Sequence, residues 1–156
     1  MTFSIVGHCQ TTGQFGMAVA SSSPAVAARC AHARAGVGAV ASQNVTDPRL
    51  GPSALDQLAA GLSAKAALKA VIADADHTDY RQLLIVDRHG GTAIHSGAKS
   101  LGIHTEHAAP HVAAAGNLLA NSTIPEVMVA SFTKTGGHLG DRLVAAMQAA
   151  LAAGGE

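Results

Sequence analysis

Two short apolar stretches separated by turn residues open the chain. Residues 2–9 and 15–21 are rich in β-branched and small apolar side chains and suit two strands. The segment between them contains Gly13, a residue that accommodates the positive φ of a tight turn. The pattern therefore predicts an antiparallel hairpin at the start of the chain.

The rest of the pattern predicts grouped strands and grouped helices. Residues 36–43 have no polar face and predict a buried strand, whereas the apolar residues 25–33 fit a strand or a helix equally well. The other predicted strands cover 81–87, 92–96 and 112–116, and the predicted helices cover 52–60, 63–73, 126–133 and 139–153. Such grouping indicates a single α+β domain over residues 1–156, with antiparallel sheets built from hairpins.

The charge content excludes some classes of partner. Lys+Arg and Asp+Glu each number 10, and charged residues make up only 13% of the sequence. This neutral balance provides no electrostatic footprint for nucleic acid or for an anionic membrane surface. A sparsely charged surface also suggests that another subunit covers part of it, so we expect a homo-oligomer or a hetero-oligomer with a second chain.

The cysteines and the first residues predict a cytoplasmic protein. Cys9 and Cys30 are too few for a disulfide framework and form no Cys-x-x-Cys motif, so we expect buried thiols in a reducing compartment. No signal peptide is visible, and no apolar run reaches the length of a membrane span. Aromatic residues amount to 3%, fewer than a protein that stacks a flat cofactor usually carries, and we expect no cofactor.

Several motifs carry a resemblance to a known family. In chain order they are Thr-Phe-Ser-Ile-Val at 2–6, Ala-Val-Ala-Ser at 18–21, Ala-Arg-Ala-Gly-Val-Gly-Ala-Val-Ala at 33–41, Asp-Pro at 47–48, Gly-Pro at 51–52, Arg-Gln at 81–82, Val-Asp at 86–87 and Gly-Asn-Leu-Leu at 116–119. The opening hairpin resembles that of proteasome-like N-terminal-nucleophile (Ntn) hydrolases. More specifically, the chain is similar to an uncharacterised bacterial family grouped with them, the domain of unknown function number one thousand and twenty-eight.

The resemblance implies a four-layer αββα sandwich, in which two antiparallel sheets face each other between layers of helices. It also implies hydrolysis of an amide-like C–N bond. Family members generally continue past a Gly-Gly acidic segment with strands that complete a sheet, whereas this sequence stops at Gly154-Gly155-Glu156. We therefore expect either a truncated form or a self-cleaved protein whose remaining strands lie on a second chain.

Thr2 is the candidate nucleophile that the resemblance implies. In an Ntn hydrolase the hydroxyl or thiol of the first residue attacks a carbonyl, and its own α-amine, with a pKa of about 7.7–8.0, serves as the base. This role requires removal of Met1, because a retained Met1 leaves Thr2 without a free amine. The simpler interpretation of Thr2 is a strand residue with high β propensity.

Ser21 and Arg34 are candidates to support the nucleophile. Ser21 ends the second predicted strand, where its hydroxyl would orient the nucleophile or bind substrate, or would only close a turn through local hydrogen bonds. Arg34 precedes the third predicted strand, roughly where related sites place a cation that depresses the pKa of the nucleophile. A guanidinium cannot shuttle protons, however, and an ordinary surface charge is the alternative for Arg34.

Amide and hydroxyl groups after two strands complete the candidate substrate site. Ser42, Gln43 and Thr46 follow the third predicted strand, and Asn117 ends a later one. Backbone N–H groups and side-chain amides at such positions are candidates for an oxyanion hole. Loop amides also commonly satisfy turns, so both interpretations stay open.

The nine histidines raise the question of a metal site. His104-x-x-His107 would place two imidazoles on one face of a helix, but Pro110 interrupts any helix here and no His-Glu-x-x-His motif occurs. We therefore predict no metal. A role for His104 or His95 as an acid/base group lining a pocket is more consistent with the pattern.

Together these features predict an Ntn-type amidohydrolase that acts on a small polar metabolite through an acyl-enzyme. Its substrate would be an amide, a cyclic amide or a ureido compound. Two alternatives stay open: a non-catalytic scaffold subunit, or the α chain of a self-cleaved hydrolase whose nucleophile begins the second chain.

Overall fold

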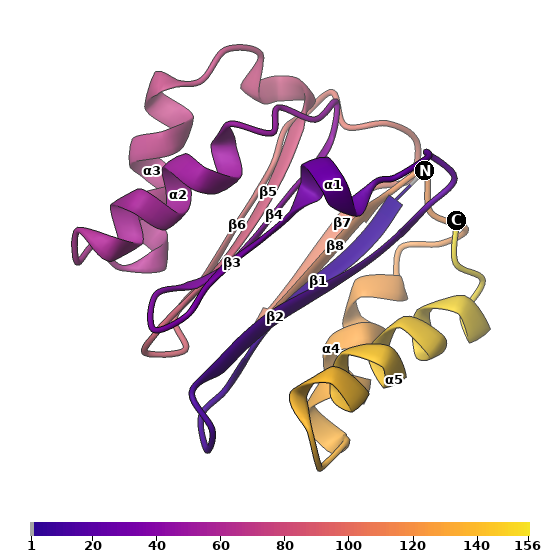
Figure 1. Ribbon diagram of the computed structural model, residues 1–156. Helices are drawn as coiled ribbons and strands as arrows, with labels where there is room; N and C mark the ends of the chain where they lie inside the picture. Colours follow the sequence, from indigo (N-terminus) through magenta and orange to yellow (C-terminus); the bar gives the residue numbers. More distant parts are fainter. Residues whose placement is uncertain (1) are drawn as a thin grey trace.

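A computed structural model describes residues 2–156, so the predicted fate of Met1 lies outside the described residues. Within this range two four-stranded sheets face each other, and a pair of helices covers the outer side of each sheet (Figure 1). All neighbouring strands are antiparallel. The start of the first strand and the end of the chain lie at the same end of the molecule (Figure 1).

Each sheet contains one predicted hairpin, formed by residues 2–21 in the first sheet and by residues 81–96 in the second. The first sheet has the order β2-β1-β8-β7 and the second has the order β3-β4-β5-β6. The strands of the first sheet are β1 (Thr2–Cys9), β2 (Gln14–Ser21), β7 (Thr105–Ala109) and β8 (Val112–Asn117). Those of the second sheet are β3 (Ala31–Arg34), β4 (Gly38–Asn44), β5 (Arg81–Asp87) and β6 (Thr92–Ser96).

The long helices form the two outer layers. The second sheet is covered by α2 (Leu50–Ala59) and α3 (Ala64–Asp74), and the first sheet by α4 (Ile124–Lys134) and α5 (Leu139–Ala152). Two short helices, α1 (Ala27–Cys30) and η1 (Thr78–Tyr80), lie in the connections. The Ser63 side chain caps α3 by accepting a hydrogen bond from the backbone N–H of Ala66, as its position before the helix predicts.

Period-two alternation along β1 explains why the chain forms layers. Phe3 and Ile5 point outward and pack in the cluster under α4 and α5, whereas Val6 packs between the two sheets. Small residues such as Ala41 and Ala115 fill much of the space between the sheets and allow them to approach closely. Thr2 and Ser4 lie on the same side of β1 as Val6, so the first residues of β1 direct polar side chains toward the second sheet.

The α+β class and the opening hairpin are confirmed, and the structure adds to the sequence prediction in two places. Residues 25–33 divide between a single helical turn, α1, and the beginning of strand β3. Strand β7 was not predicted; it contains His107 and pairs with β8, so His104 and His107 do not share the face of a helix, as the position of Pro110 had indicated. Pro110 falls in the turn between these strands, consistent with its inability to continue a regular element.

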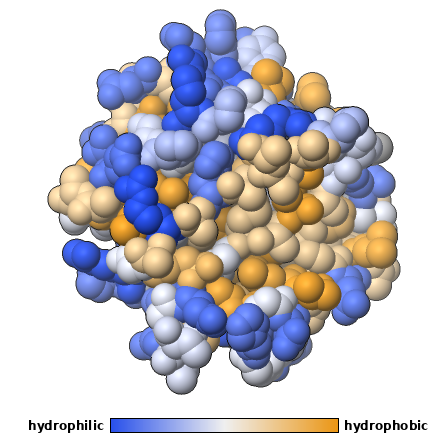
Figure 2. Space-filling view, in the orientation of Figure 1, coloured by the Kyte–Doolittle hydropathy of each residue, from blue (hydrophilic) through white to orange (hydrophobic). Residues whose placement is uncertain are grey.

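An apolar area covers the face of the molecule on which α1 and β2 lie (Figure 2). Every residue of β2 after Gln14 is only partly buried, although the strand contains Phe15, Met17 and Val19. The low charge content predicted that a subunit covers such a surface, and this assembly stays a prediction. Within residues 2–156, no helix has both the length and the apolar character needed to span a bilayer.

Candidate active site

A cavity of about 260 Å³ lies at the end of the two sheets where β1 begins and β4 ends. It is lined by Thr2, Ser21, Ser23, Val26, Arg29, Cys30, Asn44, Thr46, Leu101 and Asn117. The topology explains why these residues meet. In an antiparallel sheet the first residue of a central strand faces the last residues of both neighbours, and Thr2 is accordingly paired with Ser21 on one side and Asn117 on the other.

The hydroxyl of Thr2 is held in a short chain of hydrogen bonds. Its Oγ1 lies 3.0 Å from Oγ of Ser21, and the backbone N–H of Ser23 donates to that same Ser21 oxygen at 3.1 Å. Thr2 is buried, whereas Ser21 is half-buried beside it. The Thr2 hydroxyl therefore has a hydrogen-bonding neighbour, and Thr2 lines a cavity large enough for a small molecule.

Arg29 brings a positive charge to the cavity. Its Nη1 donates to the backbone carbonyl of Pro24 at 2.9 Å, and its Nη2 donates to Oγ of Ser23 at 2.5 Å. Both partners lie in the segment just before α1, so these two hydrogen bonds hold the guanidinium against the start of that helix. No other side chain that lines the cavity is charged at neutral pH.

Cys30 follows Arg29 and closes the cavity wall as a neutral group. It is buried, and its Sγ lies 3.7 Å from Oγ1 of Thr46. Burial raises the pKa of the Cys30 thiol, an effect larger than the opposing influences of Thr46 and Arg29. Since the thiolate is the nucleophilic form, Cys30 is a poorer candidate nucleophile than Thr2.

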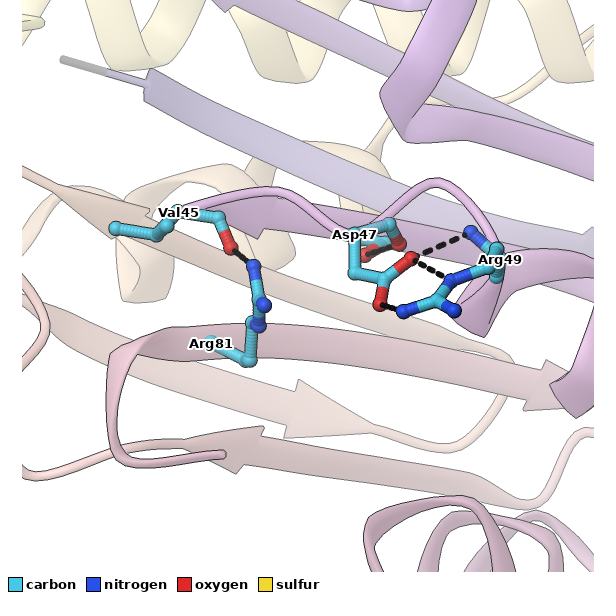
Figure 3. Close-up of polar contacts among 5 residues, drawn as sticks. Val45, Asp47, Arg49 and Arg81 are labelled. Carbon is cyan, nitrogen blue, oxygen red and sulfur yellow. Dashed lines mark hydrogen bonds and ion pairs between the residues drawn. The ribbon is translucent and has the colours of Figure 1, made fainter. Parts of the chain in front are cut away.

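Two arginines hold the loop that follows β4, to which Thr46 belongs, through Val45 and Asp47 (Figure 3). The guanidinium of Arg81 donates to the backbone carbonyl of Val45. Asp47 accepts hydrogen bonds from Arg49 at its backbone N–H (3.0 Å), its Nε (3.0 Å) and its Nη2 (2.7 Å). The side-chain hydrogen bonds from Arg49 are the main reason why the pKa of Asp47 falls to about 2.

A buried polar network lies between the sheets behind the cavity. Oε1 of Gln82 accepts from Nδ2 of Asn117 at 2.9 Å and from Nε2 of Gln43 at 3.1 Å. Nε2 of Gln43 also donates to the carbonyl of Ala115 at 3.2 Å, and Oε1 of Gln43 accepts from the hydroxyl of Ser4 at 2.5 Å. The network fixes Asn117 from behind, while both amide hydrogens of Gln43 are used within it.

The structure brings four of the predicted site residues together: Thr2, Ser21, Thr46 and Asn117 all line the cavity. Gln43 lies behind it, and its amide therefore does not supply the predicted oxyanion hole. Ser42 lies on the opposite face of β4 from Gln43 and donates to the carbonyl of Asp47 at 3.1 Å. Strand alternation thus prevents the Ser42 and Gln43 side chains from facing one site.

Arg34 and His104 lie outside the cavity. Arg34 is at the far end of β3, opposite Gly38, and its Nη2 forms an exposed ion pair with Asp56 at 2.9 Å. His104 precedes β7, with its Nδ1 3.2 Å from the carbonyl of Gly102. The cation that does line the cavity, Arg29, was missed because the segment 25–33 could not be assigned to a helix or a strand from its pattern.

Two other observations bear on the choice of site. A larger cavity of about 590 Å³ lies between α3 and the edge strands β6 and β7, and contains His95 and His107. Lys65 and Lys69 also line it, but it has no side-chain amide comparable to that of Asn117 beside Thr2. Among the described residues, His, Cys, Asp and Glu side chains form no group of three or more that could hold a metal ion.

The chain is similar to a known protein family and to a solved structure. The model of a family of unknown function, DUF1028, matches residues 2–156. The chain is also similar to the crystal structure of protein SPO2555 from Silicibacter pomeroyi, which carries the same family model. The two are 29% identical with a TM-score of 0.93, over 98% of this chain and 71% of that chain. None of the curated proteins compared with the chain matches it.

Proposed function

Because the chain belongs to the DUF1028 family, whose function is unknown, we propose an activity from the cavity itself: hydrolysis of an amide-like C–N bond in a small polar molecule, with Thr2 as the nucleophile. The observation that carries this proposal is the position of the Thr2 hydroxyl. It faces the cavity from the first position of a central strand, with Ser21 and Asn117 on either side. The four layers, two sheets between two pairs of helices, support an Ntn-hydrolase-like interpretation of the fold.

The proposed reaction uses groups that already stand together. Once Met1 is removed, the α-amine of Thr2 takes the proton of its own hydroxyl, since such an amine titrates at about pH 7.7–8.0. Oγ1 then forms a bond to the carbonyl carbon, the C–N bond breaks, and the proton passes to the departing nitrogen. Attack of water on the resulting ester releases the acid and restores the hydroxyl of Thr2.

Neighbouring side chains have supporting roles in this proposal. Ser21 orients the hydroxyl of Thr2 through their 3.0 Å contact. Asn117 lies opposite Thr2 on β8, and its amide donates a hydrogen bond to Gln82. This amide is the candidate to bind the carbonyl oxygen of the scissile bond. These contacts hold the groups in place before the substrate binds. Such preorganisation is what stabilisation of a transition state requires.

Two readouts test the proposal on the full chain. Intact mass determines whether Met1 is removed, and a β-lactone probe, which acylates reactive N-terminal threonines, determines where the chain is labelled. We expect the label on Thr2, no label in Thr2→Ala, and retained labelling in Thr2→Ser. Ammonia or amine release from small amides and ureido acids, and formation of the ring-opened amino acid from cyclic amides, should follow the same order. The loss in Thr2→Ala should reach several orders of magnitude, by analogy with about 10⁶ in a serine protease.

Thr12→Ala is the matched control, because Thr12 lies in the exposed turn between β1 and β2. It should be labelled and should turn over substrate like the unmodified chain. Retention of Met1 in an active protein, or a Thr2→Ala variant with unchanged turnover, would show that Thr2 is not the nucleophile. Absence of labelling and turnover in every variant would instead favour a non-catalytic subunit.

A further inference from the structure

We infer that the cavity recognises a carboxylate on its substrate through Arg29, so that the substrate is a short amide or carbamoyl compound with one free acid group. The statement that such a compound is hydrolysed rests on the proposed function, whereas the binding of a carboxylate by Arg29 does not depend on it. Among the side chains that line the cavity, only that of Arg29 is charged at neutral pH. A substrate that enters this space therefore meets one charged side chain, Arg29, among neutral side chains.

The guanidinium of Arg29 is prepared for an anion. Its two described partners, the carbonyl of Pro24 and the hydroxyl of Ser23, are both neutral oxygens. Within residues 2–156 no carboxylate forms an ion pair with Arg29, whereas Arg34 pairs with Asp56 and Arg49 pairs with Asp47. A guanidinium has more N–H donors than these two partners use, and its planar fork matches the two oxygens of a carboxylate.

The size and lining of the cavity limit the rest of the ligand. Its volume of about 260 Å³ is smaller than the roughly 300–1,000 Å³ of sites for drug-sized molecules. Hydroxyl and amide groups predominate in the lining, and Val26 and Leu101 are the large apolar residues in it. A short polar chain fits this description, with its amide carbonyl at Thr2 and its carboxylate at Arg29.

Calorimetric titration separates binding from chemistry when it is performed on the Thr2→Ala chain. The probes are succinamate, glutaramate and N-carbamoyl-β-alanine, each compared with its uncharged amide. We expect each acid to bind about tenfold to a hundredfold more tightly than its neutral partner, the range for a hydrogen-bonded charge. Arg29→Gln, added to Thr2→Ala, should abolish the preference, and Arg29→Lys should restore part of it.

Arg88→Gln serves as the control for loss of one positive charge, because Arg88 is exposed in the turn between β5 and β6, away from the cavity. It should retain the preference for the acids. Equal affinity of acids and neutral amides, binding of neither, or a preserved preference in a folded Arg29→Gln variant would overturn the inference. A preference that depends on Arg29 in a protein without Thr2-dependent turnover would contradict only the proposed hydrolysis.

Discussion

Asn117 and Gln82 are joined across the two sheets by a hydrogen bond of 2.9 Å, from Nδ2 of Asn117 to Oε1 of Gln82. A backbone carbonyl sets this orientation. Nε2 of Gln82 donates to the carbonyl of Gly116 at 3.1 Å, and a carbonyl can only accept. Oε1 of Gln82 must therefore turn toward Asn117, so the main chain determines how the amide at the cavity wall is presented.

Replacing Gln82 by Met should destabilise the protein by about 1–3 kcal/mol, because the buried amide of Asn117 would lose its acceptor. Met keeps a similar length, so loss of hydrogen bonding rather than loss of volume dominates. Urea unfolding measures the change. Ser96→Ala, which removes only the half-buried hydroxyl that accepts from Nε2 of Gln82, is the milder comparison. Equal effects of the two substitutions would contradict a central role for Gln82.

The ion pair between Asp47 and Arg49 should make stability depend on acid pH. The pKa of Asp47 is lowered to about 2 in the folded protein, below the value of about 3.9 in an unfolded chain. Its contribution is therefore complete above about pH 4 and is lost as the pH falls toward 2. We expect a contribution of about 1 kcal/mol, because the Arg49 side chain is 84% exposed and water screens the pair.

Unfolding free energies of the protein and of Asp47→Asn, measured from about pH 6 to pH 2, check this expectation. The two curves should be separated at the upper end and converge at the lower end. Asp74→Asn, which changes an exposed carboxylate at the end of α3, controls for general charge effects. Curves that remain parallel down to pH 2 would exclude the predicted role of Asp47.

The His8–His111 pair should make the stability of the protein depend on pH in the neutral range. Their Nδ1 atoms lie 3.0 Å apart, and the His8 ring stacks on Phe15 with centroids 4.5 Å apart. Burial, followed by the charge of His111, lowers the pKa of His8 below its usual 6.5. A depressed histidine pKa means that the unfolded chain binds more protons, so this contribution to stability is present above about pH 6.5 and is lost as pH falls.

His111→Asn should flatten the decline in stability between about pH 7.5 and pH 5.5, because it removes one cause of the low His8 pKa. Asn suits the left-handed backbone of residue 111, which has a φ of 69°. His77→Asn is the matched control, since His77 has a φ of 57° but is exposed. Identical pH profiles for the two variants would refute the coupling.

Gly38, the first residue of strand β4, has no room for a side chain next to strand β5. A Cβ at this position would lie 2.4 Å from the backbone oxygen of Val86 and 2.7 Å from the Leu58 side chain. Because the backbone oxygen cannot move aside, Gly38→Ala should lower the free energy of unfolding by about 1–3 kcal/mol. Gly136→Ala, with no atom within 4 Å of its new Cβ, should change stability by less than about 1 kcal/mol. Thermal unfolding of both variants tests the contrast.

Local pattern determined much of the fold and part of the candidate site. Alternating apolar residues and a turn glycine predicted the hairpin of β1 and β2, and this hairpin alone places Thr2 opposite Ser21. The helices over α2, α3, α4 and α5 were also predicted to within a few residues at their ends. These features depend on residues close in the sequence, whose spacing records which face is buried.

The tertiary structure decided the rest. Asn117 reaches Thr2 only because β8 pairs with the free side of β1, a contact between residues 115 positions apart that no local pattern specifies. The choice of Arg29 over Arg34 has a similar cause: the turn of α1 fixes one guanidinium at the cavity, whereas β3 carries the other toward Asp56. Long-range strand pairing and the path of short connections depend on the packing of the whole chain, so residue type and spacing identified the candidate groups but could not assemble them.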